Sequence, residues 1–167
     1  LNLDGNQTYM HTISGGNVNV GGSTTGTLTL GEGARVEAAA TVNIGANGTV
    51  NLVGQQGTNA TLTLNSGDTW NGTINNTSRY SSNKGYLELN GFDNSTTDGS
   101  STAVYTQNSG SAILSLTNGA KLQLDTEGSY ISTGEVMVGT SSDDTGNSLI
   151  LNNRSEERRV GKECRSR

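Results

Sequence analysis

Few residues of this chain combine the type and the spacing that catalysis or metal binding requires. His11 is the single histidine, and neither cysteine nor clustered carboxylates surround it at the spacing of a metal site. A Ser-His-Asp arrangement would have to use the same residue. Before residue 154, Asp143 and Asp144 form the only adjacent acidic pair, and the Ser- and Gly-containing stretch around them indicates a loop. We therefore expect no catalytic, cofactor-binding or metal-binding residue.

The other carboxylates are scattered. Glycoside hydrolysis needs two carboxylates that face each other across one groove. The aspartates show no common spacing that would bring this about; they are Asp4, Asp68, Asp93, Asp98 and Asp125. The sequence also lacks the Gly-Gly-x-Gly-x-Asp repeat of calcium-binding solenoids. The pattern favours a protein that is not an enzyme.

Threonine and aromatic side chains could serve recognition instead. Thr-x-Thr pairs at 27–29 and 61–63 are typical of ice-binding ladders, but Asn, Lys and Gln replace them elsewhere, which indicates an ordinary solvated wall. We expect the aromatic residues to cover corners or fill edges rather than stack on sugars; they are Tyr9, Trp70, Tyr80, Tyr86, Phe92, Tyr105 and Tyr130. Longer irregular segments between 66 and 106 are the first place to look for a partner.

The composition limits the elements that could position such residues. Gly, Thr, Asn and Ser account for 86 of 167 residues, hydrophobic residues for 30% and charged residues for 15%. These shares exclude a large globular core and leave a disordered linker or a repetitive β-structure. No apolar run approaches the length of a membrane helix. A net charge of −5 without a basic patch argues against nucleic acid.

Short segments with aliphatic residues at i and i+2 recur throughout the chain. This period is that of a strand with one buried face, and the segments are too short and too rich in Gly, Thr and Asn for helices. The segments are 18–20, 28–30, 42–44, 50–52, 62–64, 87–89, 114–116, 122–124, 136–138 and 149–151. They predict an all-β chain.

The spacing of the segments predicts their arrangement. Neighbours often lie eight to ten residues apart, and longer correspondences return after 22 to 27 residues: 20 to 44, 64 to 89, 89 to 116, 116 to 138 and 124 to 151. Three strands per repeat are typical of a chain wound around a triangular prism, with about seven coils in 153 residues. The alternative is a sandwich of antiparallel hairpins, which the Asn-Gly pairs at 47, 71, 90 and 118 would suit.

Several segments resemble the passenger repeats of bacterial autotransporters, the AIDA-like adhesins of type V secretion. The resemblance rests on Gly26–Val36, Ala60–Gly67, Ser111–Leu122 and the Gly134–Gly139 strand followed by Gly146–Leu151. It implies a right-handed parallel β-helix, a three-sided β-solenoid, that a C-terminal β-barrel exports across an outer membrane. The chain contains neither a barrel nor a signal peptide and begins with Leu1, so we expect a fragment of such a passenger.

The last fourteen residues, 154–167, differ from the rest. They hold six of the ten basic residues and the single cysteine, Cys164, and they resemble the in-frame translation of a short-read sequencing adaptor. We expect residues 1–153 to form the β-helix and 154–167 to be a non-native, disordered tail. Residues 1–153 then carry four basic and twelve acidic residues, a net charge of −8, and no cysteine. Absence of cysteine suits an extracytoplasmic route.

These expectations combine into a function. We expect a secreted or surface-displayed fragment, outside the bacterial cell, that acts as a non-enzymatic adhesin or structural stalk. Its partners would be host-surface or matrix glycans or proteins, or other copies between cells, with no nucleic acid and no membrane contact except through an absent barrel. The alternative is a fragment of a β-helical polysaccharide-processing enzyme or of a phage tail fibre.

The adaptor interpretation predicts that the native gene diverges after Asn153. Resequencing the source locus past this codon should give a different downstream sequence. A native codon run that encodes the same fourteen residues would contradict the interpretation.

Overall fold

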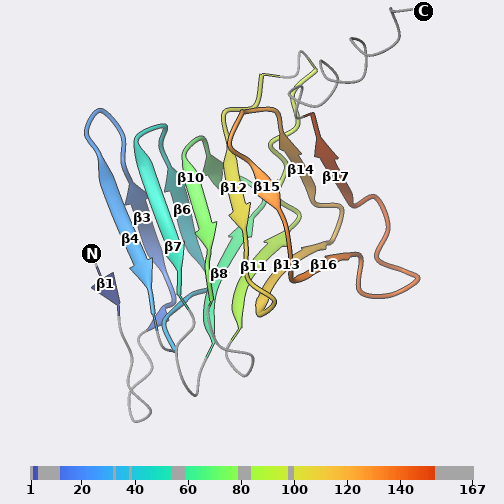
Figure 1. The fold of residues 1–167 in the computed structure, drawn as a ribbon, viewed down its shortest axis with the longest axis horizontal. Helices are drawn as coiled ribbons and strands as arrows, with labels where there is room; N and C mark the ends of the chain where they lie inside the picture. The colour runs from blue at the N-terminus through green and yellow to red at the C-terminus, as the bar shows by residue number, and fades with distance from the viewer. Residues whose placement is uncertain are drawn as a thin grey trace, which may run out of the picture.

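The chain winds into a parallel, three-sided β-solenoid (Figure 1). A computed structural model describes residues 2–3, 12–31, 33–37, 39–53, 59–78, 84–97 and 100–152. All regular secondary structure within these ranges is β-strand. Every strand pairing there is parallel, so the fold class predicted from the sequence is confirmed and the antiparallel sandwich is excluded.

Three faces make up the solenoid. Sheet one contains β1 (Asn2–Leu3), β4 (Gly26–Leu30), β7 (Gly48–Leu52), β10 (Thr73–Asn76), β12 (Val104–Gln107) and β15 (Tyr130–Ile131). Sheet two contains β2 (Thr12–Ile13), β5 (Arg35–Val36), β8 (Ala60–Asn65), β11 (Gly85–Asn90), β13 (Ala112–Thr117) and β16 (Glu135–Val138). The third face contains β3 (Gly16–Val20), β6 (Ala40–Ile44) and β9 (Thr69–Trp70), then β14 (Lys121–Leu124) and β17 (Ser148–Leu151).

The number of turns is lower than the sequence predicted. Six strands in one sheet define five turns, not seven. Register partners in successive turns are as few as 22 residues apart between β4 and β7 but 31 apart between β10 and β12. Loops between the faces lengthen most turns beyond the 22 residues on which the prediction was based. At about 4.8 Å per strand, five turns extend about 24 Å along the axis.

Inward-facing aliphatic side chains stack in rows that run along the axis. Leu64, Leu89 and Leu116 occupy one register row on sheet two, and each is fully buried. All ten predicted segments lie within strands. The five predicted long correspondences coincide with the observed strand register. The core of the solenoid is therefore a set of stacked rows, each continued by the next turn.

The sequence analysis missed β10 and β12 because their inward positions carry polar side chains. Asn76 and Gln107 are fully buried, and the Tyr105 hydroxyl donates a hydrogen bond to Gln107 Oε1 at 2.6 Å. Asn76 Nδ2 donates to the Gly85 carbonyl at 2.8 Å and to the Tyr105 hydroxyl at 3.3 Å. Burial raises the pKa of the Tyr105 phenol well above its usual range. This buried polar cluster occupies a place that a pattern of aliphatic pairs could not reveal.

Three aromatic residues fill the same part of the interior. The Trp70 ring lies 6.2 Å from that of Phe92 and 6.1 Å from that of Tyr105, between ring centroids, and all three residues are at most 2% exposed. Trp70 Nε1 donates to the Gly72 carbonyl at 3.0 Å. The expectation that aromatic residues fill space rather than stack on sugars is confirmed for these three. Tyr9 and Tyr80 lie outside the described residues.

Ladders of hydrogen-bonded polar side chains run along the outside of each face. On sheet one, Asn75 Nδ2 donates to Asn51 Oδ1 at 3.0 Å, and Thr106 Oγ1 donates to Asn75 Oδ1 at 2.8 Å. On the third face, Asn43 Nδ2 donates to Asn19 Oδ1 at 3.0 Å. On sheet two, Asn90 Nδ2 donates to Asn65 Oδ1, also at 3.0 Å. The outer wall is therefore braced by stacked amides.

Close backbone approach explains glycine at one corner. A Cβ on Gly48 would lie 2.1 Å from the Val20 carbonyl oxygen of the preceding turn, well inside any tolerated contact. Gly21 faces it across the same corner with a φ of +69°, which side chains rarely adopt. Successive turns can therefore pack closely at this corner only with glycine.

Truncation of a stacked leucine should cost far more inside the solenoid than at its open end. We expect Leu89→Ala to lower the free energy of unfolding by about 2–5 kcal/mol, because it leaves a cavity between two neighbouring turns. Leu151→Ala, whose side chain is 54% exposed on β17, should cost less than about 1 kcal/mol. Urea unfolding followed by circular dichroism measures both, and equal losses would contradict the row-based core.

Candidate functional site

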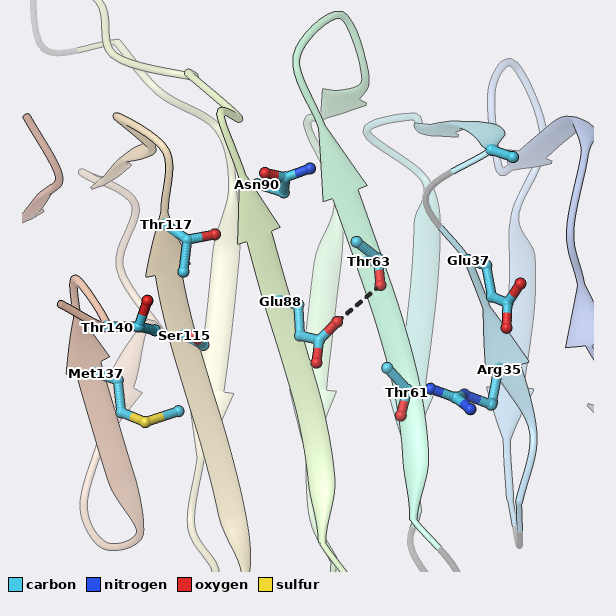
Figure 2. A pocket seen from close by; sticks show the side chains of 11 residues that line it. Arg35, Glu37, Thr61, Thr63, Glu88, Asn90, Ser115, Thr117, Met137 and Thr140 are labelled. Carbon is cyan, nitrogen blue, oxygen red and sulfur yellow. Dashed lines mark hydrogen bonds between the residues drawn. The ribbon is translucent and has the colours of Figure 1, made fainter. Parts of the chain in front are cut away.

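A groove of about 760 Å³ crosses the outer surface of sheet two (Figure 2). We call it the sheet-two groove. Side chains from β5, β8, β11, β13 and β16 and from the segments that follow them line it: Arg35, Glu37, Ala39, Thr61, Thr63, Glu88, Asn90, Ser115, Thr117, Met137 and Thr140. Because parallel stacking places equivalent residues of five turns side by side, the groove runs along the solenoid axis.

Short hydroxyl side chains form the floor of the groove. Thr61, Thr63 and Ser115 are 7%, 8% and 7% exposed although they point outward from sheet two. Thr63 Oγ1 donates a hydrogen bond to Glu88 Oε2 at 3.1 Å, drawn as the dashed line in Figure 2. Within the part of the chain that the structure describes, the hydroxyls of Thr61 and Ser115 have no hydrogen-bond partner. The floor therefore offers two buried hydroxyls to a bound molecule.

Charged residues lie at one end and in the middle of the groove. Arg35 on β5 and Glu37 just after it lie at one end, and Glu88 on β11 lies in the middle. The single ion pair among the described residues joins Lys121 to Asp93 on the third face, at 3.1 Å. The guanidinium and both glutamates of the groove are therefore outside any ion pair in that part of the chain.

The sequence analysis did not identify Glu37 and Glu88. The structure brings both glutamates to one groove, in turns separated by β8, so that their backbones are about 10 Å apart at the usual strand spacing. The signal was present in the repeat itself. Arg35 pairs with Thr61, and Thr61 pairs with Tyr86, so the same shifts place Glu37, Thr63 and Glu88 in successive turns.

The aspartates singled out in the sequence hold the turns together. Asp68 Oδ1 accepts the Val42 N–H of the preceding turn at 2.9 Å, and its other oxygen accepts the Asn65 N–H at 2.7 Å. Asp125 Oδ2 accepts the Ser101 N–H at 3.0 Å. Asp4, Asp98 and His11 lie outside the described residues. The described aspartates are thus separate from one another and from the sheet-two groove.

Asp143 and Asp144 lie in the loop between β16 and β17, as predicted. Asp144 Oδ1 accepts the Asn118 N–H of the preceding turn at 2.7 Å and the Asn147 amide at 2.9 Å. The Asn147 amide is the main cause that holds the pKa of Asp144 below 3.8; the Asn118 N–H adds to the effect and desolvation opposes it. Asp144 therefore braces a corner.

Asp93 lies on the third face, where it forms an isolated parallel bridge with Lys121. Its Oδ1 accepts the Ser95 hydroxyl at 2.5 Å and the Ser95 N–H at 2.9 Å. The Ser95 hydroxyl is the main cause that holds the pKa of Asp93 below 3.8; partial burial opposes it, and Lys121 contributes less. A second hollow of about 310 Å³ borders Asp93 within the 66–106 region where we expected a partner.

No metal-binding group of three or more His, Cys, Asp or Glu side chains occurs among the described residues. Within the same ranges, no helix has the length and apolar character needed to cross a membrane.

Comparisons with known proteins give no relative. No family model matches the chain, and no match is found among the curated proteins or the solved structures. The arrangement of the site must therefore carry the functional argument.

The ranking of causes at Asp93 can be measured. Ser95→Ala should raise the pKa of Asp93 toward 3.8 more than Lys121→Met does, because the serine hydroxyl contributes most. Since the folded pKa is depressed, the stabilisation by Asp93 is complete above about pH 4 and is lost as pH falls through the folded pKa. Carboxyl-carbon NMR titration checks both variants, and a larger effect of Lys121→Met would contradict this ranking.

Proposed function

We propose that this chain is part of a surface-displayed autotransporter passenger that acts as a non-enzymatic adhesin or structural stalk outside a bacterial cell. The observed β-solenoid agrees with the passenger repeats that segments such as 26–36 and 111–122 resemble. A stack of turns extends a surface along one axis without a large core, which suits a spacer or a presenting scaffold.

The observation that supports this proposal most directly is the use of the acidic side chains. Asp68, Asp125 and Asp144 each accept a backbone N–H from the preceding turn. These carboxylates replace hydrogen bonds that a corner cannot make by itself. Side chains that brace one turn against the next favour a mechanical role for the solenoid.

A β-helical polysaccharide-processing enzyme is the second candidate, because Glu37 and Glu88 share the sheet-two groove. A pair of carboxylates separated by about 10 Å approaches the upper end of the spacing in inverting glycosidases. A phage tail fibre would share the solenoid without this groove chemistry.

Display and turnover assays separate the candidates. Cells that carry the chain fused to an outer-membrane anchor should adhere to glycan- or matrix-coated surfaces, or to one another, more than cells with the anchor alone. The purified chain should release no reducing ends from a panel of polysaccharides. Release that disappears in Glu88→Gln but persists in Glu135→Gln, a glutamate of sheet two that does not line the groove, would overturn the non-enzymatic proposal.

A further inference from the structure

We propose that the sheet-two groove binds an uncharged, hydroxyl-rich oligosaccharide that lies along the solenoid axis. This inference rests on the proposed adhesin function and gives it a site and a ligand class. The argument begins at the floor of the groove, continues to its charges and ends with the polymer that fits both.

The floor contains polar groups that the protein itself leaves unused. Thr61 and Ser115 are more than nine-tenths buried, and their hydroxyls have no partner within the described residues. A buried hydroxyl without a partner is unfavourable, so positions of this kind usually serve a ligand or water. The two residues lie on β8 and β13, which flank β11 on either side. A molecule that reaches both must span three turns.

Glu88 lies between these two hydroxyls. One of its oxygens accepts the Thr63 hydroxyl, which orients the carboxylate within the groove. Ionised carboxylates are strong acceptors for hydroxyl donors. Thr61 and Ser115 can both donate and accept, and the Arg35 guanidinium donates at one end. The site therefore offers donors and acceptors in alternation, which matches the hydroxyl groups of a sugar.

The shape of the site favours a polymer. Equivalent residues repeat at about 4.8 Å along the axis, and the lining extends from β5 to β16, about 19 Å at that spacing. Short side chains on the floor with longer ones at either end leave an open channel rather than an enclosed pocket. A chain of similar units can make the same contacts turn after turn.

Charge and apolar content disfavour other ligands. Two carboxylates against one guanidinium would repel phosphates, sulfates and uronic acids. Met137 and Ala39 are the apolar residues of the lining, so the large aromatic and aliphatic anchors typical of a protein interface are not supplied here. Neutral sugars are the polymers that this lining accommodates best.

The experiment uses the purified full chain and isothermal titration calorimetry. The probes are short neutral oligosaccharides of glucose, mannose, galactose and N-acetylglucosamine, with uronic-acid and sulfated oligosaccharides in parallel. At least one neutral probe should bind, with little dependence on salt. The double variant Thr61→Val with Ser115→Ala should weaken that binding about tenfold, because two hydrogen bonds are lost.

A matched control separates the site from the scaffold. Thr49→Val removes an outward hydroxyl on β7 of sheet one, away from the groove, and should leave binding unchanged. Both sets of variants should keep the urea midpoint of the parent chain, because the removed hydroxyls hold no partner in the described structure.

Four results would overturn the inference: no neutral probe binds, acidic probes alone bind, the double variant binds as the parent does, or Thr49→Val weakens binding equally. If no neutral probe binds while displayed cells still adhere, the inference falls and the adhesin proposal stands. If a bound probe is cleaved, the groove binds sugars as inferred and the non-enzymatic proposal falls.

Discussion

The structure depends on one constraint: each turn must pair in parallel register with the turn before it. Successive strands of a sheet satisfy each other's backbone groups, as in the unbroken series β4, β7, β10 and β12 of sheet one. Once the register is set, a side chain has no choice of neighbours along the axis, because its equivalents in adjacent turns lie directly beside it. Leucine therefore stacks on leucine inside, and asparagine on asparagine outside.

This constraint gives polar residues a role that they lack in most small domains. An amide can donate to the next turn and accept from the previous one, which is how Asn75 joins Asn51 to Thr106. Where the backbone turns a corner and the ladder is interrupted, a carboxylate such as Asp68 or Asp144 accepts the unpaired N–H groups. A chain that is half Gly, Thr, Asn and Ser can thus build an ordered solenoid, because its polar groups are used for cohesion as well as hydration.

How far the sequence predicts this molecule follows from the same constraint. Aliphatic pairs such as Leu62 and Leu64 show a strand wherever the inward positions are apolar, and their spacing gives the register. The method fails at β10 and β12, where the inward Asn76 and Gln107 resemble surface residues. It also overestimates the number of turns, because loops can be lengthened without any change in the rows that they connect. Nor could scattered aspartates be recognised as braces before the corners that they serve were known.

The groove illustrates what only three-dimensional register reveals. Glu37, Thr63 and Glu88 are separated by whole turns, and each alone is an ordinary strand residue. Sheet one could not form the same site, because its outward Asn51 and Asn75 fill their surface and use their amides on one another. On sheet two, the smaller Thr61 and Ser115 occupy the outward positions, so the wall is hollow and its hydroxyls remain unused. A solenoid therefore acquires a binding surface where a row of small polar residues replaces a row of amides, with no change to the fold beneath.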